Sequence, residues 1–71
     1  MMAKEDKMTQ VQFRAALTRL GINQGETARL LGVTLRSVNG YANGAQVPLV
    51  VERFLRLLIE TKTPTDRYLK T

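Results

Sequence analysis

The side chains best suited to chemistry in this sequence are hydrogen-bonding groups rather than nucleophiles or metal ligands. The 71 residues include no Cys and no His, which removes disulfides and the usual soft ligands of zinc. The six carboxylates are expected in the N-terminal tail, in capping positions (Glu26, Asp66) or on the outer side of a C-terminal helix. No acid–base pair is evident among them. We therefore expect no enzymatic activity, no cofactor and no metal site.

Polar side chains gather instead on one face of a helix predicted over residues 35–42. At about 100° per residue, Arg36, Asn39, Gly40 and Asn43 fall within a single arc of about 100°. A guanidinium group can bond O6 and N7 of guanine, and an Asn amide can bond N6 and N7 of adenine. This pattern favours contact of Arg36 and Asn39 with base edges, whereas Gly40 would allow close backbone approach and carry little sequence information.

Caps and hydrophobic periodicity predict four helices that would position this face, over residues 10–20, 24–31, 35–42 and 48–60. Thr9 with Gln12, and Asn23 with Glu26, have capping-box spacing. Pro48 suits a first helical position. We find no strand signal, so the sequence predicts an all-α fold, a compact bundle of four to five short helices.

The ends of these helices are marked by turn-forming residues. Gly21 and Gly32 supply left-handed stops, Thr34 is an N-cap, and Asn43-Gly44 is an exit signal. A further start signal at 63–66 leaves two alternatives for the last residues: one closing helical turn, or a frayed end.

Residues 24–42 have the form of two short helices joined by a tight turn, Gly32 to Thr34. The small Ala28 permits close crossing of the helices, and Val38 and Tyr41 supply an apolar inner face for the second helix. This is the pattern of the helix-turn-helix that inserts its second helix into the major groove of DNA.

A wider set of ordered residues accompanies this unit, namely Leu20 to Gln24, Glu26 to Thr34, Ser37-Val38, Tyr41, Asn43-Gly44 and Pro48. Over roughly residues 13–58 the sequence resembles the Cro and phage-repressor type, or Xre, family. The resemblance implies a lambda-repressor-like DNA-binding domain that binds operator-like double-stranded DNA as a dimer and regulates transcription. Thr27, in place of a usual aliphatic residue, and Gly25 and Gly40 inside helices depart from the pattern.

The candidate base-contacting residues are Leu35, Arg36, Asn39 and Gly40. Leu35 has no hydrogen-bonding group, and two interpretations stay open: contact with a thymine methyl, or packing over the junction of the two helices.

The candidate phosphate-contacting residues are Gln24, Thr34, Ser37 and Asn43. The resemblance implies that the Gln24 amide touches a phosphate and braces the second helix. Capping alone would also account for Thr34, and turn formation alone for Asn43. Arg14, Arg19 and Arg29 are expected mainly on solvated faces.

The helix over 48–60 has more apolar residues than one core-facing stripe can bury. Val50 and Leu57 lie on one side of it, and with Tyr68 and Leu69 they form a candidate homodimer interface. The alternative is that the closing segment folds back and covers this patch. Arg53, Arg56 and Arg67 are assigned to solubility or to a subunit interface.

Composition sets the remaining expectations. A net charge of +5 and a pI near 10.3 suit a polyanionic partner. The length predicts one domain, over 9–71, after a polar tail at 1–8. We expect no membrane segment and a cytoplasmic location. The alternative function is a protein-interaction module, such as the antitoxin of a toxin–antitoxin pair, with DNA binding secondary.

Overall fold

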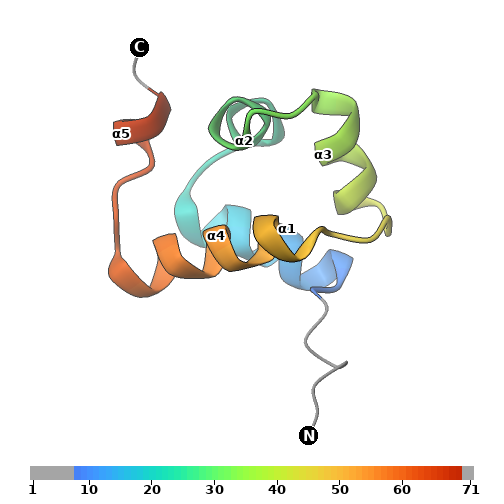
Figure 1. Ribbon diagram of the computed structural model, residues 1–71, viewed down its shortest axis with the longest axis horizontal. Helices are drawn as coiled ribbons and strands as arrows, with labels where there is room; N and C mark the ends of the chain where they lie inside the picture. Colours follow the sequence, from blue (N-terminus) through green and yellow to red (C-terminus); the bar gives the residue numbers. More distant parts are fainter. Residues whose placement is uncertain (1–7, 70–71) are drawn as a thin grey trace, which may run out of the picture.

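The computed structural model describes residues 8–69, which form five α-helices and contain no strand (Figure 1). The helices are α1 (Gln10–Leu20), α2 (Gln24–Leu31), α3 (Leu35–Ala42), α4 (Leu49–Thr61) and α5 (Asp66–Leu69). The predicted small all-α bundle is therefore confirmed. Residues 1–7 of the predicted tail lie outside the described residues. Met8, which we assigned to that tail, is buried in the core, because its side chain packs between α1 and α4.

The first two helices begin and end as their caps predict. Thr9 and Asn23 each accept a hydrogen bond from the third helical residue, whose side chain bonds back to the cap. Gly21 and Gly32 both end their helices at φ 72°, in the left-handed region where a side chain would be strained. Local sequence alone therefore accounts for the bounds of α1 and α2.

The start of α4 differs from the prediction by one residue. Pro48 was expected at the first helical position, but its ψ of 145° is extended, so it caps α4 from outside and the helix begins at Leu49. The C-terminal end extends to Thr61, and Lys62 takes a left-handed conformation there. The pyrrolidine ring holds φ near −59° and has no N–H, and both properties suit a cap as well as a first helical residue.

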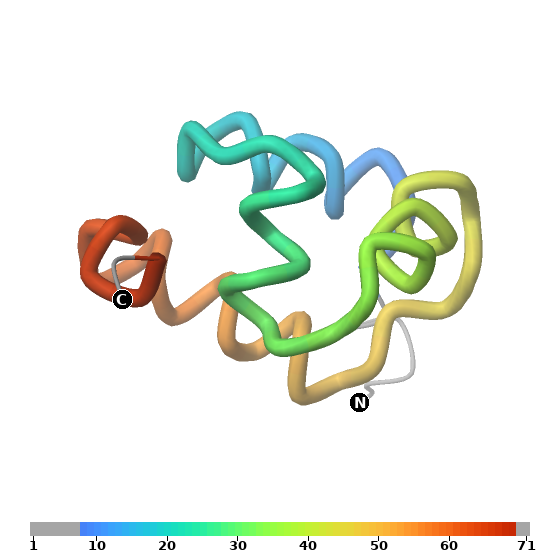
Figure 2. The backbone as a smooth tube through the Cα atoms, turned by 90° about the horizontal axis from the view of Figure 1, so that it is seen from above, coloured from blue at the N-terminus to red at the C-terminus, as the bar shows by residue number. Residues whose placement is uncertain are grey.

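The five helices enclose one apolar core. Helices α1 and α4 pack side by side, α3 packs on α1 and α2, and α5 folds back towards α2 (Figures 1 and 2). The largest fully buried side chains are Phe13, Leu55, Leu58, Val38 and Thr27. An edge-on contact between the rings of Phe13 and Tyr41, with centroids 5.6 Å apart, joins α1 to α3. This core holds α3 at one side of the bundle, with its polar residues outward.

Among residues 8–69, two polar side chains are also buried, and each has a partner. Thr27 donates its hydroxyl to the carbonyl oxygen of Asn23 over 2.7 Å, so this departure from an aliphatic residue leaves no unsatisfied group. Glu52, predicted on the outer side of its helix, is only 4% exposed. Its Oε2 pairs with Nε of Arg56 at 2.9 Å. The prediction for Glu52 was wrong because the ion pair within α4 lets the carboxylate turn inward.

Candidate nucleic-acid interface

Helices α2 and α3 meet through a turn of three residues. The Val33 N–H donates to the carbonyl oxygen of Ala28 over 3.0 Å, which closes the end of α2. Ala28 in α2 and Val38 in α3 are both buried in the core. Helices α2 and α3 thus pack on each other and share the core.

A chain of polar side chains crosses from α2 through α3 to α1. Asn39 Nδ2 donates to Gln24 Oε1 at 3.2 Å, and Asn43 Nδ2 donates to Asn39 Oδ1 at 2.8 Å. Arg14 then donates from Nη2 to Asn43 Oδ1 at 3.0 Å and from Nε to the Ala42 carbonyl at 2.7 Å. We call the outward groups around this chain the α2–α3 polar surface: Gln24, Thr34, Arg36, Ser37, Asn39 and Asn43.

Asn39 keeps bonding capacity for an external partner. One of its two amide hydrogens is used by Gln24, and one position on Oδ1 is used by Asn43. One hydrogen and one lone pair of Oδ1 remain, and these are the two kinds of group that a bidentate contact with adenine uses. Gln24 uses Oε1 internally and keeps its amide N–H groups for an anion.

Asn43 is committed within the chain. Its amide nitrogen donates to both the backbone carbonyl and Oδ1 of Asn39, while its own Oδ1 accepts from Arg14. A phosphate contact by this side chain would have to replace one of those bonds. Asn43 is therefore better described as the link between Asn39 and Arg14.

Two residues of α3 point away from the bundle. Arg36 is exposed, and Leu35 is 54% exposed. Of the two interpretations of Leu35, packing over the helix junction would bury it more fully. Both side chains are therefore free to reach a ligand laid against α3.

At the start of α3, Thr34 accepts a hydrogen bond from the Ser37 N–H at 3.0 Å and donates its hydroxyl to Ser37 Oγ at 3.0 Å. This capping role for Thr34 was predicted. Because Ser37 Oγ accepts from Thr34, the hydroxyl proton of Ser37 is left for an outside acceptor such as a phosphate oxygen.

The helical angle of Gly40 places it among the polar residues on the outward face of α3. In the structure, however, Gly40 does not lie at the centre of that face. A Cβ at this position would lie 3.6 Å from the Cβ of Ala45, and the Ala45 N–H bonds to the Gly40 carbonyl at 2.8 Å. The loop after α3 folds over this side of the helix. Sequence periodicity could not show this, because it describes the helix without the loop that covers it.

Arg14 is the residue that sequence analysis missed. We grouped it with surface arginines, yet it joins α1 to the end of α3 across 28 residues of sequence. Its neighbour Phe13 is a core residue, but nothing in the local sequence distinguishes Arg14 from Arg19. Only the packing of α1 against α3 brings its guanidinium to the Ala42 carbonyl.

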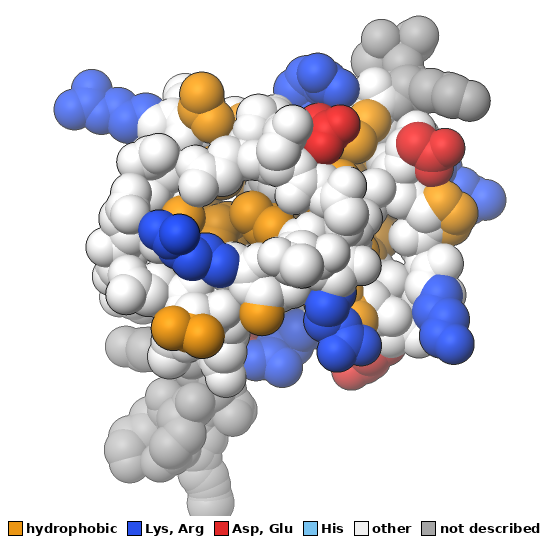
Figure 3. Space-filling model, turned by 180° about the vertical axis from the view of Figure 1, so that it is seen from behind, with side chains coloured by type: hydrophobic (Ala, Val, Ile, Leu, Met, Phe, Trp, Pro, Cys, Tyr) orange, Lys and Arg blue, Asp and Glu red, His pale blue; other side chains and the backbone are white. Residues whose placement is uncertain are grey.

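Basic side chains are spread widely over the molecule. Seen from behind, Lys and Arg side chains lie over several separate parts of the surface, with apolar and acidic side chains between them (Figure 3). The electrostatic argument for a polyanionic partner therefore depends on the overall charge of +5, while the directed hydrogen-bonding groups lie on the α2–α3 polar surface.

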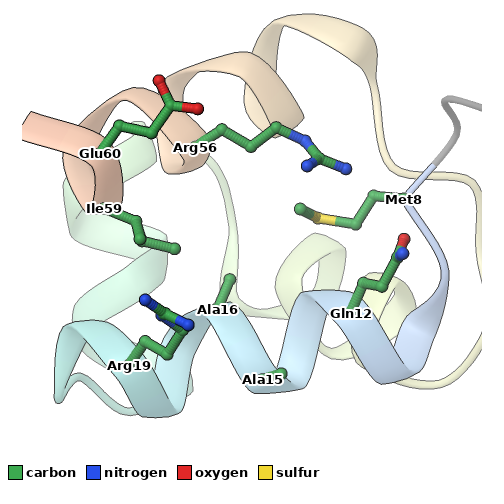
Figure 4. A pocket seen from close by; sticks show the side chains of 8 residues that line it. All are labelled: Met8, Gln12, Ala15, Ala16, Arg19, Arg56, Ile59 and Glu60. Carbon is green, nitrogen blue, oxygen red and sulfur yellow. The ribbon is translucent and has the colours of Figure 1, made fainter.

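A groove of about 370 Å³ lies between α1 and α4 (Figure 4). Met8, Ala16 and Ile59 supply apolar walls, while Arg19 and Glu60 bring opposite charges to it. Because none of its lining residues belongs to α2 or α3, it is separate from the α2–α3 polar surface. Within residues 8–69 no group of three or more His, Cys, Asp or Glu could hold a metal ion.

The candidate interface residues on α4 and α5 divide into two sets. Val50 and Leu57 are 79% and 55% exposed, and α5 does not cover them. Leu69, in contrast, is half-buried against the core, because α5 folds back towards α2. Tyr68 lies edge-on to Phe54, with ring centroids 5.8 Å apart. The closing segment is thus helical, and it covers only part of the apolar surface.

No protein-family model, no curated protein and no solved structure matches this chain. Among the described helices, none has the length and apolar character needed to cross a bilayer.

Proposed function

We propose that this chain is a helix-turn-helix protein that binds double-stranded DNA sequence-specifically, as a homodimer, and represses or otherwise regulates transcription. Helix α3 enters the major groove, and α2 crosses the backbone beside it. In this arrangement Arg36 and Asn39 contact base edges, Leu35 reaches a thymine methyl, and Gln24 and Ser37 bond phosphates.

The observation that carries this proposal is the hydrogen bond between Asn39 and Gln24. It ties a base-reading type of side chain in α3 to an amide at the N-terminus of α2, where backbone N–H groups favour an anion. Phosphate contacts set the register of a protein on DNA, and base contacts supply specificity. A bond between one group of each kind couples the two.

The test is selection of bound sequences from a random DNA library by the full chain. We expect an enriched motif with two-fold symmetry, because a symmetric dimer presents two α3 helices to successive major grooves about 34 Å apart. An enriched motif without symmetry would support DNA binding but contradict the proposed dimer.

A salt titration on the selected site gives an independent measure. Several phosphate contacts release counterions, so log K should fall against log salt with a slope of about −0.9 for each phosphate neutralised. No enrichment in the selection, together with a slope near zero, would contradict DNA binding as the function.

A further inference from the structure

Helix α4 has an outward stripe directly opposite the core. Leu55 and Leu58 are fully buried on its inner side. At about 100° per residue, Val50, Arg53, Leu57 and Glu60 fall together on the other side, with Glu60 at the edge of this set that also lines the groove between α1 and α4. Val50 and Leu57 are well exposed, and so are both charged residues. We call these four residues the α4 stripe.

The charges of the α4 stripe are arranged around its midpoint. The midpoint between Arg53 and Glu60 along the helix axis falls between Arg56 and Leu57. At a rise of about 1.5 Å per residue, each charged residue lies about 5 Å from that midpoint. Among described residues, the ion pair within α4 is Arg56 with Glu52, on the face next to the stripe. The stripe thus has opposite charges on either side of an exposed Leu57.

This pattern is complementary to itself in one orientation. If a second α4 is antiparallel and centred on the same point, Arg53 lies opposite the partner's Glu60 twice, and each Leu57 lies within about 1 Å of the two-fold axis along the helix, next to its own counterpart. A parallel pair in register would instead oppose like charges. We propose that two copies of this chain associate through antiparallel α4 stripes, with Leu57 next to the axis and two reciprocal Arg53–Glu60 ion pairs.

The surroundings of the stripe support a second copy as its occupant. Phe54 and Tyr68, in edge-on contact, extend the apolar surface beside Val50 and Leu57. Helix α3 joins the N-terminal end of α4 through residues 43–48 (Figure 1), so an antiparallel pair puts the two α3 helices at opposite ends. This interface rests on the proposed function, because binding to a two-fold symmetric DNA site is the reason for two copies of the chain.

The test is a charge exchange measured by sedimentation equilibrium without DNA. A single pair of short helices forms a small interface, so we expect dissociation in the micromolar to millimolar range. Arg53→Glu and Glu60→Arg should each weaken the dimer by about tenfold or more, because each puts like charges opposite one another. The double variant should return to within about threefold of the wild-type dissociation constant, because both ion pairs re-form with reversed polarity.

Arg29→Glu on α2 is the matched control, with the same change of charge on an exposed helix away from the stripe, and it should leave the dissociation constant unchanged. Thermal melting establishes that each variant is folded. If Arg53→Glu does not fold, Arg53→Gln combined with Leu57→Ala serves instead and should also weaken the dimer.

Three results would overturn the interface: a wild-type chain that stays monomeric up to about 1 mM, single variants that dimerise like wild type, or a double variant that does not recover. Its failure is distinguishable from failure of the proposed function. If any of these results is found and DNA selection still yields a motif, the proposal of DNA binding stands and only the interface is wrong. If the double variant recovers dimerisation but DNA selection yields no motif, the interface stands and the proposed function is wrong.

Discussion

Arg14 in α1 donates a hydrogen bond from Nε to the carbonyl oxygen of Ala42 at the last residue of α3, over 2.7 Å. The last carbonyls of a helix have no partner within the helix itself, so a cation placed there satisfies one of them and interacts favourably with the helix dipole. The same guanidinium bonds Asn43, which bonds Asn39. Arg14 thus stabilises α3 and orients the polar residues next to its end.

Arg14→Met should lower the free energy of unfolding by about 1 to 3 kcal/mol, the range for losing a charged partner of a hydrogen bond. For a domain of this size, that corresponds to a fall in Tm of several degrees. Arg19→Met, with the same loss of charge on the same helix, is the control and should change Tm much less. Equal losses in the two variants would show that charge, and not the bond to Ala42, is responsible.

Val38→Asp should unfold the domain, because the side chain is fully buried and a carboxylate there has no partner. Leu35→Asp is the control one turn earlier on α3, where the side chain is 54% exposed. Circular dichroism should show a cooperative melt for Leu35→Asp and none for Val38→Asp. A cooperative melt in both would contradict the packing of α3 on the core.

Arg36→Ala and Gln24→Ala should affect DNA binding differently. Removing Arg36 should relax preference at one base pair in each half-site, at a cost of about 1 to 3 kcal/mol. Removing Gln24 should weaken binding to all sequences. Competition binding against single-base variants of the selected site measures both. A uniform loss for Arg36→Ala would make it a phosphate contact and shift base recognition to Leu35 and Asn39.

The Asn39–Gln24 bond adds a further expectation for Gln24→Ala. Because Asn39 loses its partner, preference at the base pair that the proposed function assigns to Asn39 should also weaken. The same competition measurements resolve this effect, and Gln24→Glu, which keeps an acceptor for Asn39, should retain the preference at that base pair.

Gly40→Ala should raise stability by about 1 kcal/mol, because Ala is the better helix former and its Cβ would make an ordinary contact with Ala45. DNA affinity should be unchanged, since that Cβ faces the loop. Gly21→Ala is the contrasting variant and should destabilise, because φ is 72° there. If Gly40→Ala raised Tm but weakened DNA binding, Gly40 would face the DNA, as the helical periodicity alone suggested.

Local interactions explain why so much of the secondary structure is predictable from the sequence. The capping boxes at Thr9 and Asn23 and the left-handed glycines act within a few residues of each helix end, so the bounds of α1, α2 and α3 agree with the prediction. The start of α4 differs by one residue, because the fixed φ of Pro48 is compatible with a cap and with a first turn alike.

The sequence by itself determined which residues are apolar at helical spacing, where α1, α2 and α3 begin and end, and which polar groups share a face of α3. The tertiary structure decided which of those groups are free. It placed Arg14 against Ala42, covered Gly40 with the loop at Ala45 and left Leu57 exposed. These outcomes depend on contacts between segments that are distant in sequence or on loops that fold over helices, and helical periodicity contains no information about either.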